Sequence, residues 1–305
     1  MRVNGWASSA AIGLEVVMIA AAIGAASWAA SPWITVAAII LVGARQHALL
    51  VLMHDATHRS LYADRQVNDV VGELLAWSLG ITLNSYRAEH FAHHQHLNGA
   101  DDPDWARTHG EAEPRAHEWR FPASPRRIAR LLLRDVTGLD TGQQILDIWR
   151  YAGSGGQEGV RRLEPVLPGW LRGLVFAGLA GVLTWTGAWS GFVLFWIIPA
   201  LTWLKMALRL RYMAEHFAVP GSLTGDGTRT TIASWWERLL IAPLNIGYHV
   251  EHHRHPSVPQ RSLVKLHELM LAKACYGEGE HWTTGYVSGA LGELSAYTHG
   301  GQYGA

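Results

Sequence analysis

The chain has 305 residues, of which 49% are hydrophobic and 16% are charged, and its formal net charge at pH 7 is zero. This composition is too apolar for an ordinary soluble domain and too polar for a chain embedded entirely in lipid, and the zero net charge argues against a nucleic-acid partner. The single cysteine, Cys275, excludes an internal disulfide and a cysteine-based iron–sulfur or zinc site.

Four stretches are apolar enough to cross a bilayer, which takes about 20 residues per helix. They cover residues 7–30, 33–53, 170–189 and 191–213. The links within the first pair and within the second pair are short and nearly uncharged, so each pair is predicted to form a tight hairpin. Because arginine and lysine lie at the opposite ends of the spans, the positive-inside rule places both termini and all polar connections in the cytoplasm.

The predicted fold is therefore an all-α membrane protein with four transmembrane helices in two hairpins and a cytosolic helical cap. Residues 1–53 form the first hairpin, and residues 54–169 form a cytosolic helical region. Residues 170–213 form the second hairpin, and residues 214–305 form a cytosolic C-terminal region. The first span is too long for a cleavable signal peptide and is followed at once by another span.

Two segments that contain arginine are expected to lie near the membrane surface. Arg45 lies near the polar end of the second span, where it is expected to reach the membrane interface or to pair with a substrate headgroup. A helix is also predicted at residues 126–134, where arginines alternate with apolar residues. Its basic face suits lipid headgroups and solvent equally, so both interpretations stay open. The arginines of this helix are Arg126, Arg127, Arg130 and Arg134.

Three short histidine clusters follow the predicted spans: HDATH at 54–58, HFAHH at 90–94 and HVEHH at 249–253. Histidines four residues apart lie on one helix face and can reach one metal ion, whereas the histidine next to them lies about 100 degrees round the helix and can face a second ion. Neutral imidazole is a common transition-metal ligand, and eight imidazoles exceed what one ion uses. We therefore predict a two-metal site on the cytosolic side.

These clusters, in this order and after these spans, resemble the integral-membrane fatty acid desaturase superfamily, which also contains alkane hydroxylases and carotenoid hydroxylases and ketolases. The resemblance covers roughly residues 45–270, and three further segments support it: DDPD at 101–104, AEH at 214–216 and PSVP at 256–259. It implies a di-iron centre that uses O2 as co-substrate.

The resemblance also implies nine metal ligands, with His216 as the ninth. One iron would be bound by His54, His58, His90, His94 and His252. The other would be bound by His93, His216, His249 and His253.

Three features depart from particular branches of the superfamily. Tyr212 stands where the acyl-CoA branch has an asparagine one turn before the isolated histidine. His249 is kept, although front-end desaturases often carry glutamine there, and the His-Pro-Gly-Gly haem motif of their fused cytochrome b5 domain is missing. Tyr212 therefore leaves the coordination and the substrate open.

Other polar residues near the clusters are expected to orient the ligands through their second ring nitrogens rather than to bind metal. His47 lies on the same helix face as His54 and is expected either to belong to this group or to be an extra ligand. No catalytic residue is expected beyond the ligands. Substrate-binding residues are not identifiable. The carboxylates of the group are Asp55, Glu89, Glu215 and Glu251. Histidines expected at the surface are His109, His117, His267, His281 and His299.

An unactivated methylene has no acidic proton and no leaving group, so its oxidation needs a redox metal and dioxygen. We predict a desaturase of a fatty acyl or other long apolar chain, and a hydroxylase or ketolase of a lipid or terpenoid is the alternative. A non-enzymatic metal transporter or haem protein is less favoured, because it would need histidines within the spans. Without a cysteine cluster, a dinucleotide-binding loop or a haem motif, electrons should come from a separate ferredoxin, rubredoxin or cytochrome b5-like carrier.

Overall fold

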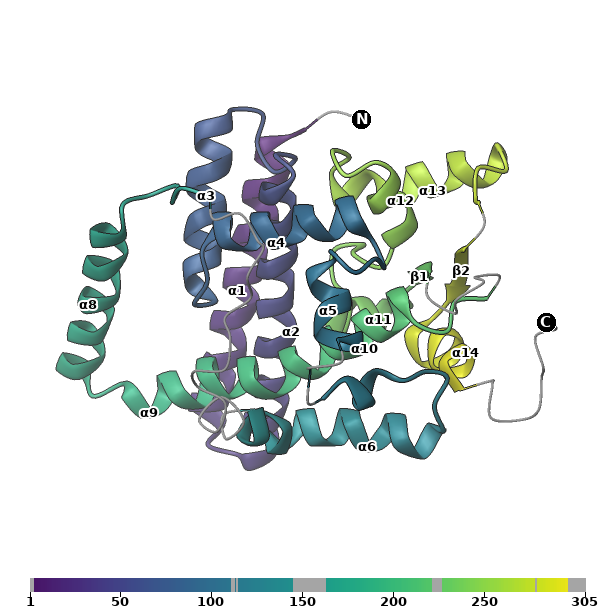
Figure 1. Ribbon diagram of the computed structural model, residues 1–305. Helices are drawn as coiled ribbons and strands as arrows, with labels where there is room; N and C mark the ends of the chain where they lie inside the picture. The colour runs from purple at the N-terminus through teal and green to yellow at the C-terminus, as the bar shows by residue number, and fades with distance from the viewer. Residues whose placement is uncertain are drawn as a thin grey trace. The chain divides into compact units, whose positions relative to one another are not determined.

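A computed structural model describes residues 3–110, 113, 115–144, 163–220, 227–277 and 279–295 of the chain (Figure 1). The described residues are mostly helical. They form two compact units. The first comprises Met1–Ala88 with Asp140–Lys205, and the second comprises Glu89–Leu139 with Met206–Ala305.

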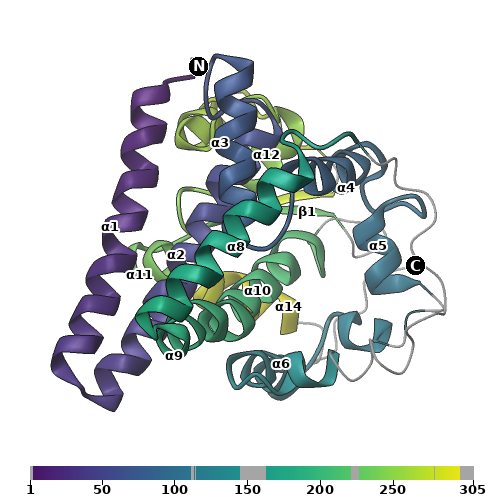
Figure 2. The same ribbon diagram turned by 90° about the vertical axis from the view of Figure 1, so that its left-hand side faces the viewer.

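The first unit is built on two long antiparallel helices, α1 (Gly5–Ala29) and α2 (Pro32–Thr57), which lie side by side (Figures 1 and 2). Asn4 begins α1 by accepting a hydrogen bond from the backbone N–H of Ala7 at 3.2 Å. Ala30 ends α1 in the left-handed conformation, and the proline at the start of α2 suits the first turn of a helix. The predicted first hairpin therefore has the local signals that its turn requires.

A buried ion pair joins α1 to α2. Arg45 Nη1 lies 3.0 Å from Glu15 Oε2, and both side chains are almost fully buried. The expectation that Arg45 reaches the membrane interface or a substrate headgroup was wrong. Its charge is neutralised by a glutamate that comes from the other helix of the hairpin, which is how ionisable groups within membrane segments are commonly accommodated.

The third long apolar segment runs from Trp189 to His216 and contains two wide turns. It consists of α9 (Trp189–Phe192), π-helical segments at Val193–Ile197 and Ala200–Leu204, and α10 (Lys205–His216). Gln46 of α2 donates a hydrogen bond from Nε2 to the carbonyl of Trp196 at 2.9 Å. A π-helical turn alters the backbone ladder, and this side chain satisfies a carbonyl inside it.

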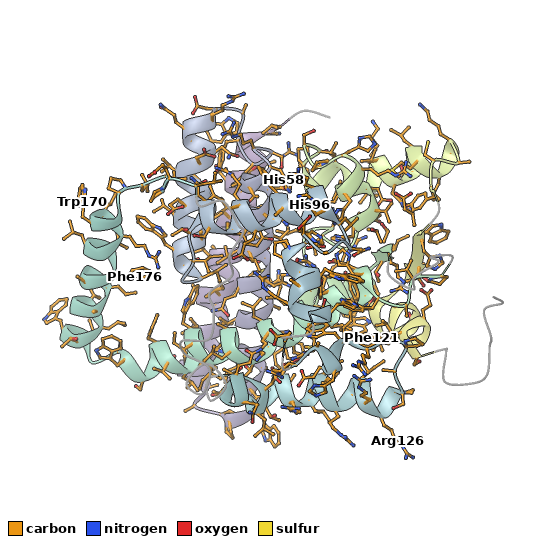
Figure 3. The ribbon with its side chains drawn as sticks, in the orientation of Figure 1. His58, His96, Phe121, Arg126, Trp170 and Phe176 are labelled. Carbon is orange, nitrogen blue, oxygen red and sulfur yellow. The ribbon has the colours of Figure 1, made fainter. Side chains whose placement is uncertain are left out.

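Among the described residues, α1, α2 and the segment Trp189–His216 are long and apolar enough to cross a membrane. Helix α8 (Gly169–Thr186), which covers the third predicted span, is not one of them. Trp170 and Phe176 project from α8 (Figure 3), and Trp170 and Trp185, near its two ends, are well exposed. The arrangement of four spans in two hairpins therefore stays a prediction.

The remaining helix of the first unit, α3 (Arg65–Ser78), packs on α2. A Cβ atom at Gly72 would lie 2.5 Å from the Cβ of Ala56, so only glycine allows this approach. Glu73 accepts hydrogen bonds from the indole of Trp77 at 2.7 Å and from the backbone N–H of Leu83 at 2.8 Å. The second contact places the start of α4 (Leu83–His96), the helix that carries the second histidine cluster.

The second unit contains short helices and one small sheet. Strands β1 (Thr228–Ile232) and β2 (Glu280–Thr284) pair in parallel, with Thr230 opposite Trp282. The prediction of an all-α fold was wrong in this respect, because two strands about fifty residues apart leave no local signal of their pairing. The helices of this unit are α5 (Pro103–His109), α6 (Pro125–Val136), α11 (Trp235–Leu240), α12 (His249–Arg254), α13 (Leu263–Ala272) and α14 (Leu291–Ser295). Shorter turns are Ala116–Trp119, Gln260–Ser262 and Tyr286–Ala290.

Removing one partner of the Arg45–Glu15 pair leaves a buried charge, which typically costs about 3 to 5 kcal/mol. We expect Glu15→Leu to lower the unfolding temperature of the detergent-purified protein strongly, and the double variant Glu15→Leu/Arg45→Met to recover most of the loss. Arg65→Met, on the exposed first turn of α3, is the control. A single variant as stable as the wild type would contradict the structural role of the pair.

Gly43 lies where α2 meets the π-helical part of the third segment. A Cβ atom there would lie 2.8 Å from the Cβ of Trp203 and 3.1 Å from the carbonyl of Pro199. Gly43→Ala should therefore lower the unfolding temperature, although alanine is ordinarily better than glycine within a helix by about 0.5 to 1 kcal/mol. Gly24→Ala in α1 meets nothing within 4 Å and is the matched control. Equal unfolding temperatures for the two variants would refute the close packing.

Candidate metal centre

Three helices of the second unit bring four imidazoles to one place. His249 and His253 lie one turn apart on α12, and their Nε2 atoms are 3.0 Å apart. His249 Nε2 is also 2.9 Å from Nε2 of His216, the last residue of α10. His93 of α4 completes the group, in which all the candidate ligand atoms lie within 4.8 Å of one another. These four residues are the set that the family resemblance assigns to one iron.

The spacing of these nitrogens fits a metal ion. Two imidazole nitrogens at about 2.1 Å from one ion are about 3.0 to 3.4 Å apart when their bonds meet at right angles or at tetrahedral angles. The Nε2 pair at 3.0 Å lies at the lower limit of this range, and the pair at 2.9 Å lies 0.1 Å below it. Imidazole nitrogens that face one another at this spacing could bind one metal ion.

A second group of imidazoles adjoins the first. His94 Nε2 lies 3.0 Å from His90 Nε2 and 2.9 Å from His252 Nε2. The rings of His94 and His253 are stacked with centroids 4.3 Å apart, so the two groups share a border. The second unit therefore brings together seven of the nine predicted ligands. They are His90, His93, His94, His216, His249, His252 and His253.

The two histidines of the first cluster belong to the first unit, at the end of α2. The ring centroids of His54 and His58 are 5.0 Å apart. Arg87 donates to the carbonyls of Ala56 and Thr57 at 3.1 and 3.2 Å, so a guanidinium caps this helix end. Burial lowers the pKa of His58 to about 4, and the charge of Arg87 acts in the same direction. His58 is therefore neutral at physiological pH, as metal binding requires.

Asp102 orients His93. The Nδ1 of His93 donates to the Asp102 carboxylate, at 3.1 Å from Oδ1 and 3.0 Å from Oδ2, which leaves Nε2 available to bind a metal. The backbone N–H groups of Asp104 and Asn98 also donate to this carboxylate, at 2.9 and 3.0 Å. Burial raises the pKa of Asp102, but these hydrogen bonds outweigh it and the net shift is downward. Asp102 stays ionised and holds the proton of His93 on Nδ1.

Histidine 249 is held in the neutral form by its surroundings. Burial lowers its pKa well below the usual range, and the neighbouring His253, His216 and Arg211 lower it further. The Oε2 of Glu215 lies 3.6 Å from His249 Nδ1, which is too far for a direct hydrogen bond. Glu215 is instead paired with Arg211, one turn earlier on α10, at 2.8 Å.

The other residues predicted to orient ligands lie on α4, α2 and α12. Glu89 is paired with Arg107 at the surface. Asp55 and His47 are buried in α2 of the first unit. Glu251 is buried within α12 and accepts hydrogen bonds from Thr230 Oγ1 and from His267 Nδ1, each at 2.6 Å. Its contacts tie α12 to β1 and α13 rather than to a ligating imidazole.

Two histidines predicted at the surface have structural roles. His267 is only 5% exposed, and it contacts Glu251 and the hydroxyl of Tyr276. The surface assignment of His267 was therefore wrong. His109 stacks on Trp105 with ring centroids 3.7 Å apart and faces Phe217 at 5.6 Å. His117 is exposed, as predicted.

Strand β1 forms hydrogen bonds to the end of α10 and to the start of α12. Arg229 is fully buried and donates to the carbonyls of Ala214 and Ala218 at 2.5 and 2.7 Å, at the end of α10 around His216. The next residue, Thr230, accepts from the backbone N–H of Val250 at 3.1 Å, in the first turn of α12. Successive strand residues point to opposite sides, so one strand positions both His216 and His249. Neither Arg229 nor Asp102 was predicted as a residue that positions the ligands.

The described part of the chain thus combines converging imidazoles that could bind a metal with three helices long and apolar enough to cross a membrane. Residues 30–286 match the sequence model of the family described as "Fatty acid desaturase", and the chain belongs to this family. Members found to be similar are desaturases and a ketolase, and the chain is an oxidoreductase of this kind.

Three relatives illustrate the range of the family. The dihydrorhizobitoxine desaturase of Bradyrhizobium elkanii is 27% identical over 87% of this chain and 76% of its own length. The sn-1 oleoyl-lipid 12-desaturase of Anabaena variabilis is 27% identical over 82% of this chain and 72% of its own. The beta-carotene ketolase of a Paracoccus species is 26% identical over 69% of this chain and 70% of its own.

Removing a converging imidazole should weaken metal binding. We expect His93→Ala, His216→Ala and His253→Ala each to lower the iron content of the purified protein while its helix content by circular dichroism stays near that of the wild type. His117→Ala, on an exposed histidine, is the control. Full iron content in one of the three variants would remove that residue from the centre.

Asp102→Asn keeps the shape of the side chain but removes the charge that holds the His93 proton on Nδ1. Losing such a partner typically weakens metal binding about 10- to 100-fold. Competition with an iron chelator should show a loss of this size for Asp102→Asn and none for Asp101→Asn, its exposed neighbour. Equal iron retention by both variants would show that Asp102 serves α5 alone.

Proposed function

We propose that the chain is an O2-dependent di-iron desaturase, which introduces a double bond into a fatty acyl chain or another long apolar chain. The observation that carries the proposal is the convergence of seven imidazoles from three helices, in a chain of the desaturase family. Histidine-rich ligation separates this centre from the soluble di-iron bundles, which use Glu-x-x-His motifs.

In this proposal one iron is bound by His93, His216, His249 and His253. The family resemblance assigns the other to His90, His94 and His252 together with His54 and His58. Bound iron would supply the redox chemistry with dioxygen that inert carbon–hydrogen bonds require. Burial lowers the pKa of His249 and so keeps this ring neutral, and Asp102 holds the proton of His93 on Nδ1, which leaves its Nε2 available to a metal ion.

The proposal includes the membrane and the electron supply. The chain would cross the bilayer four times, in two hairpins, with both termini and the metal centre in the cytoplasm. Its apolar substrate would enter from the lipid. A ferredoxin, rubredoxin or cytochrome b5-like carrier would deliver the electrons, because this sequence contains no cysteine cluster, Gly-x-Gly-x-x-Gly loop or haem motif.

A hydroxylase or ketolase is the second candidate, and the beta-carotene ketolase relative favours it. Desaturation removes a second hydrogen from the neighbouring carbon, whereas hydroxylation returns oxygen to the first carbon. The relatives' names refer to an sn-1 oleoyl lipid, dihydrorhizobitoxine and beta-carotene, which are chemically different compounds. Substrate trials should therefore cover lipids, carotenoids and smaller amphiphiles.

Product analysis decides between the two reactions. The chain is expressed in a bacterial host, and the host lipids and any fed carotenoids are analysed by mass spectrometry, with the His253→Ala variant as the inactive control. Loss of two mass units supports desaturation, and a gain of 16 or 14 mass units identifies a hydroxylase or ketolase. Purified, iron-loaded protein that turns over without an added electron carrier would contradict the proposed partner.

A further inference from the structure

One face of helix α6 (Pro125–Val136) is buried in the second unit, and the opposite face is exposed to solvent. It begins at Ser124, whose side chain accepts from the backbone N–H of Arg127 at 3.3 Å, and proline occupies its first turn. Ile128, Leu131 and Asp135 are buried on the inner side. The inner side therefore belongs to the core of the second unit, and only the outer side can meet a partner.

The inner side of α6 is joined to α10, the last part of a candidate membrane span. Arg209 of α10 lies 2.5 Å from Asp135 through Nε and 3.3 Å from Glu118 through Nη1. Its guanidinium also lies over the ring of Trp119 at 5.0 Å. Because Arg209 lies within the apolar segment Trp189–His216, these buried contacts fix α6 directly to a segment that can enter the bilayer.

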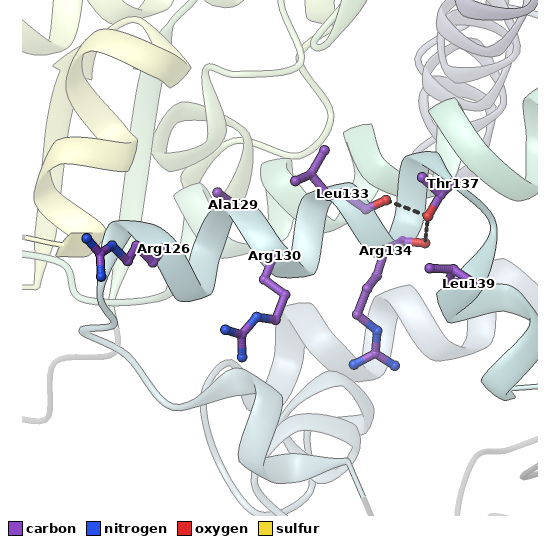
Figure 4. Close-up of a pocket in the computed structure, with 7 residues that line it drawn as sticks. All are labelled: Arg126, Ala129, Arg130, Leu133, Arg134, Thr137 and Leu139. Atoms are coloured by element: carbon purple, nitrogen blue, oxygen red, sulfur yellow. Dashed lines mark hydrogen bonds between the residues drawn. The ribbon is translucent and has the colours of Figure 1, made fainter.

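The outer side of α6 carries a shallow pocket of about 530 Å³ (Figure 4). Leu133 and Leu139 line it and are 63% and 66% exposed, so the pocket joins apolar side chains to basic ones. Within the part of the chain that the structure describes, no carboxylate pairs with Arg126 or Arg130, which also line the pocket. The lining residues are Arg126, Ala129, Arg130, Leu133, Arg134, Thr137 and Leu139.

We propose that this pocket binds an anionic phospholipid. Guanidinium groups bind phosphate oxygens through paired hydrogen bonds, so Arg126 and Arg130 would take the headgroup. The exposed leucines would contact the first part of an acyl chain, and the pocket has the size of a typical small-molecule site. Basic residues beside a membrane-spanning helix commonly contact anionic headgroups. Of the two alternatives that the sequence leaves open for the basic face of this helix, the proposal favours lipid headgroups over solvent.

A soluble acidic protein, such as an electron carrier, is the competing occupant. Its carboxylates would satisfy the arginines, and its apolar residues could cover the two leucines as well. Lipid is favoured by position, because Arg209 holds α6 to the end of a segment long and apolar enough to cross a membrane. A free phosphate ion would leave the leucines exposed, so the pocket fits best a ligand that has both an anionic head and an apolar chain.

The test uses the full-length protein in a neutral detergent. Phosphatidylglycerol, phosphatidylcholine of the same acyl chains, or inorganic phosphate is titrated in, and the unfolding temperature is recorded. We expect phosphatidylglycerol alone to raise it in a saturable way. The double variant Arg126→Gln/Arg130→Gln should need about tenfold more phosphatidylglycerol for the same shift. The variant Leu133→Ser should also bind more weakly.

The control variant is Arg65→Gln/Arg120→Gln, which removes the same charge from other exposed positions and should respond like the wild type. An unchanged response in Arg126→Gln/Arg130→Gln would overturn the proposal. An equal shift with inorganic phosphate would also overturn it, because the site would then need no acyl chain. If the double variant keeps its lipid response and loses only turnover with an added electron carrier, the patch is a protein-docking surface and the lipid assignment fails.

Discussion

A metal ion requires its ligand nitrogens to meet around one point, and this requirement governs the second unit. The ligands come from α4, α10 and α12. More than a hundred residues separate α4 from α10, and His249 follows His216 by 33 residues. Nevertheless, the Nε2 atom of His249 lies 2.9 Å from that of His216 and 3.0 Å from that of His253. Each ring must also be neutral. Burial provides this for His249, and a carboxylate on Nδ1 fixes the orientation of His93.

Two helix ends that carry histidines are each capped by an arginine. Arg229 caps the end of α10 at His216, and Arg87 caps the end of α2 at His58. In each case a buried guanidinium satisfies carbonyls that the helix leaves without intrahelical partners. Helix ends fray readily, so these arginines hold the terminal turns, and the histidines on them, in fixed positions. Thr230 and Glu251 do the same for α12 by binding it to β1 and α13.

Much of this could be predicted from the sequence, because the decisive signals are local. Hydrophobic length predicts α1 and α2, and Pro and Ser mark the start of α6. The four-residue spacing of His249 and His253 predicts their common helix face. The parallel pairing of β1 with β2, the Asp102–His93 hydrogen bond and the burial of His267 were missed. Each depends on a partner brought close only by the folded chain, and Asp102 was noticed only as part of a family motif.

The central claim is that the converging imidazoles bind two iron ions. The most direct test is the iron content of the purified, catalytically competent wild-type protein, measured by elemental mass spectrometry against protein concentration from amino-acid analysis. The account predicts two iron ions per chain, with zinc and copper at trace levels. One metal ion per chain, or a site filled by zinc in active protein, would contradict it.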